Sequence, residues 1–518
     1  MRTRRNNHFV ICLAVLMLVA FLLFPCLVEA KEPQSGDIVF AMSSGGFYQT
    51  GGDPATHWAG NPVISQTVFD SLAVENINRI PQPALAKSWK FAENWSHIDF
   101  VLRNDVKFQN GMPVTAEDIK FSLETYMRKE LRFVFGVLYR RSITQVEVVG
   151  PHQVRIHFKE PIVGILGRLQ WGSGMFPKAY REAVGDKGFA DKPIGAGPFK
   201  WVNYKQDEWF KLEAVTNHYR KSPEFNTIKF LCVPEHSTRL AMLKSGEADI
   251  VNLIAPQVPE VKAEPNLRII LAKYLAGVSL GFADLAFPQE PSPFHDIRVR
   301  KAASLAIDRK TICEKILFGC AEPLGEAIPP VALGFDPSIK PDPYGPEAAK
   351  ALLAEAGYPK GFETEFNISA GNEYWVEAVK ANLAAIGIKG NTKIYEGGAY
   401  NEATYGRKLH GLMTAWVYSQ ALLEAPAALS FSNQKNNPWC YYTTDEIDKA
   451  ITEGQWAVTD KELADSGRKI SKLIRESRKF IILWSVHGPY GVNQKIEYWE
   501  PKLGASTPSN YEYIRLKR

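Results

Sequence analysis

The sequence predicts an α/β protein of two lobes with a cleft between them. Strand-like alternation and helix-like periodicity follow one another along the chain, which is typical of mixed α/β architecture. A proline-rich passage at 287–293 interrupts the pattern and separates a mixed region from one dominated by helices. At 518 residues, the chain is also too long for one ordinary hydrophobic core.

The N-terminus has the three parts of an export signal. A basic start is followed by an uninterrupted apolar run over 9–24, and then by small residues at Val28 and Ala30, the −3 and −1 positions of a cleavage site. The basic residues are Arg2, Arg4 and Arg5. We therefore expect a signal peptide over residues 1–30, cleavage after Ala30 and a periplasmic mature protein.

Two other interpretations of this leader stay open. The apolar run is only slightly short for a membrane span, so the leader could be retained as an anchor. A lipoprotein would use Cys26, but Phe24 and Pro25 are bulky and rigid where small residues are expected.

The mature chain begins with a strand and a glycine-rich loop. Residues 37–41 start the strand, and Gly45-Gly46 and Gly51-Gly52 bracket a loop that contains Phe47 and Tyr48.

A strand, a tight turn and a capped helix then follow within 100–122. Phe100 and Leu102 alternate with polar residues, the period of a half-buried strand. Asn110-Gly111 is a turn dipeptide. Thr115 stands three positions before Asp118, the spacing of a capping box that starts a helix.

The rest of the chain alternates before it becomes helical. Strands at 146–149 and 153–158 form a hairpin, and 201–254 contains two strands and a helix. Beyond the proline-rich passage, helices are expected at 299–307, 348–356, 374–385 and 460–476, and a buried strand at 480–484.

Composition and motifs argue against a nucleic-acid-binding protein or an enzyme. The net charge is only +5, and Lys and Arg are spread along the chain rather than clustered. The ten histidines are scattered, and the chain contains neither His-Glu-x-x-His nor Cys-x-x-Cys. Ser466 and Lys469 have the spacing of a serine–lysine motif, but they lie in a charged helix without its partner motifs. We expect no catalysis, no cofactor and no metal.

Four cysteines follow the leader, and none has the spacing of a zinc site. They are Cys232, Cys313, Cys320 and Cys440. Along a continuous helix, Cys313 and Cys320 would be roughly 10 Å apart, too far to bridge. Because Gly319 can end the helix and turn Cys320 back, a disulfide and two free buried thiols both stay open.

Six ordered blocks resemble the dipeptide/oligopeptide type of solute-binding protein of ABC importers, solute-binding family 5. The segment 100–122 is similar to the family's "LR.DVKF..G.PVTAEDI.FS". The other blocks are Pro83–Trp89, Pro193–Phe199, Asn217–Tyr219 with Arg239–Ile250, Pro293–Arg309 and Ala348–Tyr358.

The resemblance implies the bilobal periplasmic-binding-protein (Venus-flytrap) fold, with a hinged cleft and an extra subdomain in lobe I. Lobe I would combine 36–75, 195–284 and 485–518; the family-specific subdomain would be 76–194; lobe II would be 285–484. Because the chain crosses between the lobes more than once, the crossings would act as a hinge.

The resemblance also implies where a ligand binds. In the family, solute lies between the loop that here carries Phe47 and Tyr48 and the end of a strand that here carries Trp416 and Tyr418. Peptide binders have an Asp that grips the ligand's α-ammonium three residues after this Trp, and here Ser419 occupies that position. Since a serine hydroxyl cannot neutralise a buried ammonium, simple peptides are expected to bind poorly.

Glu424 could substitute for the missing Asp, although it stands five residues further on. The expected ligand is a peptide or peptide-like small molecule, with an oligosaccharide, an opine or a metal chelate as alternatives. The expected partners are ABC permease subunits in the inner membrane; the protein would act as a monomer and would not bind nucleic acid. An exported hydrolase and a chemoreceptor-coupled sensor on the same fold stay as remote alternatives.

Overall fold

The computed structural model describes residues 36–43, 51–56, 62–131, 133, 135–162, 164–419, 424–435, 437, 440–504 and 509–517. The chain divides into two units, Met1–Ser35 and Gly36–Arg518, and all the described residues belong to the second. Among their helices, none has the length and apolar character needed to cross a membrane.

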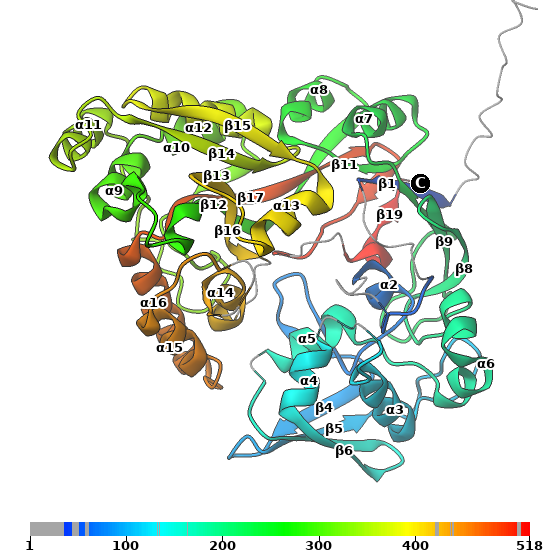
Figure 1. The fold of residues 1–518 in the computed structure, drawn as a ribbon. Coiled ribbons are helices and arrows are strands. Elements are labelled where there is room, and N and C mark those ends of the chain that lie inside the picture. The colour runs from blue at the N-terminus through cyan, green and yellow to red at the C-terminus, as the bar shows by residue number, and fades with distance from the viewer. Residues whose placement is uncertain are drawn as a thin grey trace, which may run out of the picture. The chain divides into compact units, whose positions relative to one another are not determined.

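One large mixed sheet runs through the described structure (Figure 1). Its eleven strands follow the order β15-β14-β16-β12-β17-β11-β1-β10-β9-β8, with β13 also paired to β17. We call β1 and β8–β11 the first half-sheet and β13–β16 the second half-sheet. The first comprises β1 (Asp37–Met42), β8 (Phe199–Lys205), β9 (Trp209–Ala214), β10 (Thr227–Cys232) and β11 (Ile250–Asn252); the second comprises β13 (Ala321–Pro323), β14 (Phe362–Ser369), β15 (Ile388–Tyr395) and β16 (Leu412–Ser419).

Two long antiparallel strands, β12 (Leu267–Phe282) and β17 (Phe480–Asn493), join the half-sheets. Residues 267–272 of β12 pair with 488–493 of β17 beside the first half-sheet, and 276–281 pair with 480–486 beside the second. The register shifts between Ala272 and Ala276. The half-sheets therefore meet at this interruption of the ladder; a second register shift, between Val278 and Ser279, lies within the part beside the second half-sheet.

At this interruption Tyr274 takes a left-handed backbone conformation, with φ at 61°. Its amide donates a hydrogen bond to Nδ1 of the buried His487, at 3.2 Å, and the two rings meet edge to face. Burial, together with the charge of Lys273, lowers the pKa of His487 to about 4. His487 is thus a neutral acceptor at the point where β12 changes register.

A separate four-stranded sheet lies between β3 (Pro81–Pro83) and β8 in the chain, in the order β4-β5-β7-β6. Its strands are β4 (Ala86–Phe91), β5 (His97–Leu102), β6 (Ile143–Gly150) and β7 (Gln153–Phe158), and nearby helices are α3 (Ala116–Tyr126), α4 (Gly136–Ser142), α5 (Ile165–Gly172) and α6 (Lys178–Asp191). The predicted strand, turn and capped helix are confirmed here. The Thr115 hydroxyl accepts from Asp118 N, and Asp118 Oδ2 accepts from Thr115 N at 2.9 Å.

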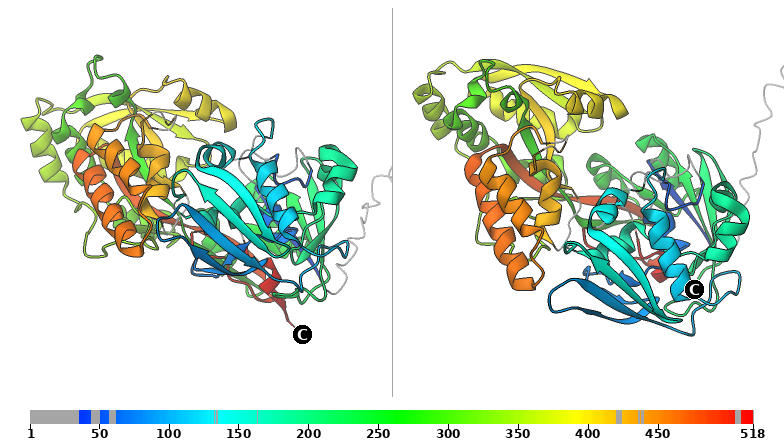
Figure 2. Two further views of the ribbon diagram at one scale, coloured as in Figure 1. Left: turned by 90° about the horizontal axis from the view of Figure 1, so that it is seen from below. Right: turned by 60° about the horizontal axis from the view of Figure 1, so that its bottom comes forward.

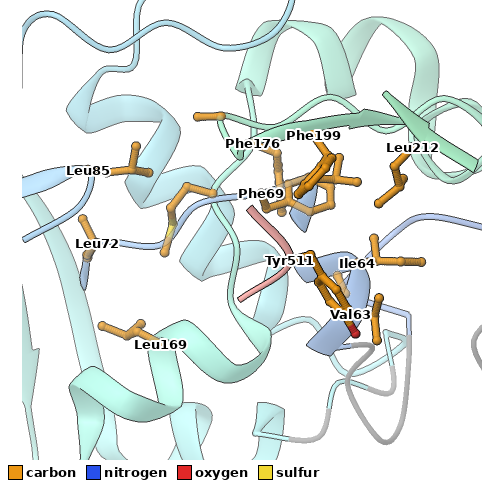
Figure 3. Close-up of a cluster of buried hydrophobic side chains, with 14 of the residues drawn as sticks. Val63, Ile64, Phe69, Leu72, Leu85, Leu169, Phe176, Phe199, Leu212 and Tyr511 are labelled. Atoms are coloured by element: carbon orange, nitrogen blue, oxygen red, sulfur yellow. The ribbon is translucent and has the colours of Figure 1, made fainter. Parts of the chain in front are cut away.

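A continuous apolar core joins this region to the first half-sheet (Figure 3). Ile64 and Phe69, from α2 (Pro62–Thr67) and the segment after it, pack with Phe176 and with Phe199 at the start of β8. Helices α7 (His236–Ser245) and α8 (Val258–Lys262) follow β10 and β11, and the short strand pairs are β2 (Ala73–Glu75) with β3 (Pro81–Pro83) and β18 (Ile496–Tyr498) with β19 (Arg515–Leu516).

The second half-sheet is accompanied by the helices of the C-terminal half, as predicted. The helices of this half are α9 (Ile297–Leu305), α10 (Arg309–Thr311), α11 (Pro346–Glu355), α12 (Glu373–Ala384), α13 (Gly397–Tyr405), α14 (Ala425–Asn433), α15 (Asp445–Gly454) and α16 (Asp460–Ser477). Helices α15 and α16 lie side by side in both views of Figure 2.

All four cysteines after the leader are free thiols. A π-helical turn, Ile312–Ile316, precedes Gly319, whose φ of 77° turns the chain into β13. Burial raises the pKa of Cys313 to about 12 and that of Cys320 to about 11. The alternative of a Cys313–Cys320 disulfide is therefore not realised.

Candidate functional site

A small pocket lies beside the end of β14 and the middle of β16. These two strands run parallel, and ligands of α/β sheets bind outside the carboxyl ends of such strands. The pocket holds about 110 Å³ and is lined by Val278, Ser369, Asn372, Trp375, Tyr400, Asn401, Thr414, Ala415 and Trp416. We call it the Trp416 pocket.

Trp416 is more exposed than the other large apolar residues of its strand. Its side chain is 38% exposed, whereas Leu412, Met413 and Val417 of the same strand are buried. The polar groups around it are held in place: Trp375 Nε1 donates to Asn372 Oδ1 at 2.9 Å, and the Tyr400 hydroxyl donates to the Thr414 carbonyl. The pocket therefore combines one accessible indole with a fixed polar wall.

The prediction that Tyr418 faces the ligand with Trp416 is not supported. Tyr418 is fully buried, and its hydroxyl lies 2.9 Å from Ser485 Oγ. Residues two apart in a regular strand share a face, but β16 has a bulge: Gly277 pairs with Tyr418 and Val278 with Trp416, so Val417 has no opposite residue. The extra residue sends the two aromatic rings to different sides.

Gly277 makes room for this bulge. A Cβ at this position would lie 2.5 Å from Tyr418 Cε1 and 2.5 Å from Val417 Cγ1. The absence of a side chain lets both residues pack against β12.

We expect Gly277→Ala to lower the free energy of unfolding by about 1–3 kcal/mol, because the methyl group overpacks a closed core. Urea denaturation measures the effect. Gly281→Ala on the same strand is the matched control. Its Cβ would meet the end of the flexible Met413 side chain at 3.0 Å, and we expect a smaller loss. Equal losses of unfolding free energy in the two variants would show that close packing at the bulge is not the cause of the destabilisation.

The remaining predicted positions are only partly described. Ser419 ends β16 opposite Ala276, next to the interruption in β12. Phe47 and Tyr48 lie outside the described residues.

Glu424, the candidate substitute for Asp, lies against α5. A Cβ on Gly164, the N-cap of that helix, would be 2.7 Å from the Glu424 carboxyl carbon. Burial and the neighbouring Glu75 raise the pKa of Glu424, and the positive charge of Arg168 opposes them. The carboxyl group therefore lies against the N-terminus of α5, within reach of the positive charge of Arg168.

Three charged residues around Glu424 had no signal in the sequence. Arg168 lies within α5, and burial lowers its pKa although Glu424 raises it. Glu75 and Arg79 form an ion pair, with 2.6 Å between Arg79 Nε and Glu75 Oε2. Because β2, α5 and α14 are far apart in the chain, no local spacing could have brought these groups together.

Across the described ranges, no three His, Cys, Asp or Glu side chains gather as metal ligands would.

Comparison with known proteins identifies the family. Residues 81–438 match the model of bacterial extracellular solute-binding proteins, family 5 Middle. Heme-binding protein A of Haemophilus influenzae is 26% identical over 465 residues, which cover 81% of this chain and 83% of that protein. The dipeptide-binding protein of Escherichia coli is 24% identical over 437 residues, covering 75% and 80%.

Solved structures share the fold. The periplasmic binding protein DppA from Helicobacter pylori, in complex with the peptide STSA, has a TM-score of 0.76 at 23% identity, covering 93% of this chain and 98% of that chain. NikA from Brucella suis, in complex with Fe(III)-EDTA, has a TM-score of 0.79 at 19% identity, covering 93% and 100%. The predicted bilobal α/β fold is confirmed. The chain belongs to the family 5 bacterial extracellular solute-binding proteins.

Proposed function

We propose that this protein is the extracytoplasmic solute-binding component of an ABC importer, and that it captures a peptide-like solute by closing two lobes around it. The closed form would then dock on permease subunits in the inner membrane. The single observation that carries the proposal is Trp416: a large aromatic residue, 38% exposed, that lines a pocket at the carboxyl end of β14, a strand parallel to its own. Rigid amphipathic rings offer large contact area at low entropic cost.

The hinge in this proposal is the interruption of β12 at Lys273–Leu275, opposite His487 of β17. The boundaries of the parts stay a prediction: lobe I is 36–75, 195–284 and 485–518, the extra subdomain is 76–194, and lobe II is 285–484. In the proposal, Phe47 and Tyr48 meet the solute from lobe I and Trp416 from lobe II. Ligand contacts made only when the lobes approach would bias the hinge toward closure.

The charges near the cleft favour a ligand without a free α-ammonium. Ser419 replaces the acidic residue of peptide binders, and Glu424 lies against the N-terminus of α5, where Arg168 offsets its charge. A ligand ammonium would have to share Glu424 with the charge of Arg168 or remain unpaired, and both cost free energy. A blocked, modified or acidic peptide avoids this cost.

Calorimetric titration with unmodified di- and tripeptides should therefore show weak binding or none. The same peptides acetylated at the N-terminus are the matched comparison and should bind at least as tightly. Submicromolar binding of several unmodified peptides would contradict the proposal and would point to Glu424 as their partner. Native mass spectrometry of protein purified without refolding tests the function itself, because a solute-binding protein should retain a small molecule.

The remaining parts of the proposal concern export and assembly. We propose that the leader 1–30 is cleaved and that the mature protein is a periplasmic monomer. N-terminal sequencing of the exported protein should begin at Lys31. A lipidated Cys26 at the mature N-terminus would overturn this expectation.

A further inference from the structure

A second, larger cavity lies apart from the Trp416 pocket. It holds about 590 Å³ and shares no lining residue with that pocket. Its walls come from α2 and the segment that leads to β3, from Gln170 of α5, from Tyr219 and Arg220, and from six residues near the C-terminus: Tyr498, Glu500, Lys502, Asn510, Glu512 and Tyr513. We call it the Lys502 cavity.

The carboxylates that line this cavity already have partners. Asp70 accepts from the Tyr219 hydroxyl at 2.6 Å and from Arg220 Nη2 at 2.6 Å. Arg220 Nη1 also lies 3.4 Å from Glu512 Oε1. The other two carboxylates are Glu75 and Glu500. Glu75 Oε2 lies 2.6 Å from Arg79 Nε, and Glu500 accepts a hydrogen bond from the Tyr498 hydroxyl at 3.0 Å.

Lys502 is the exception among the cavity's charges. It is 7% exposed, and its ammonium group donates no hydrogen bond within the described part of the chain. Burial lowers the pKa of Lys502 to about 8, although Glu75 and Glu512 raise it; Arg79 and Arg220 add to the lowering. The fold thus keeps a poorly compensated cation at the wall of a cavity.

Two amide groups in the same wall are also unused donors. Gln170, 5% exposed, accepts from Glu75 N through its oxygen, and Asn76 accepts from the amides of Asn78 and Ile80. These bonds fix which end of each amide is oxygen. Neither NH₂ group donates to any described residue.

Aromatic side chains complete the wall. Phe69, Tyr219, Tyr498 and Tyr513 line the cavity together with the polar donors. A cation and two amide donors recognise an anion, and aromatic rings recognise an apolar or planar body.

We propose that the Lys502 cavity is a second ligand site, which takes a small organic carboxylate with an aromatic or apolar body. The carboxylate would accept from Lys502, Gln170 and Asn76, and the body would lie among the rings. Binding would supply the negative charge that the buried ammonium lacks. This inference is independent of the cleft at Trp416.

Benzoate is a suitable probe, tested by ligand-observed NMR on the mature full-length protein. We expect the wild type to bind it with a dissociation constant of about 1 mM at pH 7. Lys502→Met should weaken binding at least about tenfold, in line with the loss of a charged hydrogen-bonding partner. Trp416→Ala and Lys472→Met, whose lysine side chain is 74% exposed, should bind as the wild type does. Trp416→Ala changes the proposed solute cleft and Lys472→Met removes a surface charge. Unchanged benzoate binding by both variants would therefore separate this site from the cleft of the proposed function.

The pH dependence of the wild type provides a second measurement that needs no variant. Benzoate stays ionised above neutrality, so its affinity should fall as pH rises through the pKa of Lys502, about 8 in the empty cavity. The charged groups that act on Lys502 are Glu75, Arg79, Arg220 and Glu512, and Asp70, Arg103 and Glu500 also line the cavity. Equal affinity at pH 7 and pH 9.5, unchanged binding by Lys502→Met, or no binding at tens of millimolar would each overturn the proposal.

Discussion

Replacing Asp53 by asparagine is expected to lower the free energy of unfolding by about 3–5 kcal/mol. Asp53 and Arg181 form a buried bidentate pair: Nη1 donates to Oδ1 at 3.0 Å and Nη2 to Oδ2 at 2.6 Å, with side-chain exposures of 0% and 2%. The guanidinium carbon lies 4.7 Å and 4.6 Å from the centres of two rings, those of Phe176 and Phe189. Asparagine would remove the buried negative charge and leave Arg181 only its second partner, the more exposed Asp186, whose Oδ1 lies 2.9 Å from Arg181 Nη2.

Chemical denaturation of the ligand-free protein measures the effect. Asp465→Asn is the matched control, because Asp465 forms exposed ion pairs with Lys461 and Arg468 and should contribute little. Adding Arg181→Met to Asp53→Asn should recover part of the loss, since it removes the buried cation that has lost its buried partner and keeps only Asp186. If Asp53→Asn lowers the free energy of unfolding no more than the control does, the buried Asp53–Arg181 pair does not stabilise the fold.

Trp416→Ala is expected to remove about 1–3 kcal/mol of ligand-binding free energy, as the loss of an aromatic anchor does. The ligand-free melting temperature should stay nearly unchanged, because the indole is already 38% exposed. The retained ligand, or an acetylated peptide that binds, serves for calorimetry on both proteins.

Tyr418→Ala is the contrasting variant on the same strand. Tyr418 is fully buried and is hydrogen-bonded to Ser485, so its truncation should cost about 3–5 kcal/mol of folding stability. If Trp416→Ala instead lowers the unliganded stability by a similar amount, Trp416 is a core residue and the proposed cleft is wrong.

Local elements could be predicted from the sequence because their causes are local. Thr115 and Asp118 are three residues apart, and their capping box forms as expected. Gly111 takes the positive φ, 85°, that the Asn-Gly turn requires. The apolar run 480–484 is in a strand, but β17 continues to Asn493 because β12 and β11 supply partners along its whole length.

The site residues could be predicted only in part, because their positions depend on contacts between distant parts of the chain. Trp416 could be selected because the family resemblance indicates the end of its strand, whereas Tyr418 was misplaced by a bulge that only pairing with Gly277 reveals. Arg168 and Glu75 reach Glu424 from distant parts of the chain. Lys502 looks like any surface lysine in the sequence, because its burial follows from the packing of a segment near the C-terminus.

The ladder of β12 and β17 has a consequence for modularity. Both half-sheets take their central hydrogen-bonding partners from the same two strands, so neither could be excised as an autonomous domain. Cutting the chain anywhere between the two strands and discarding one piece removes β12 or β17 from the ladder that both halves share. A split or circularly permuted form of this protein must therefore keep β12 and β17 together, and any exchange of lobes between relatives must carry both strands.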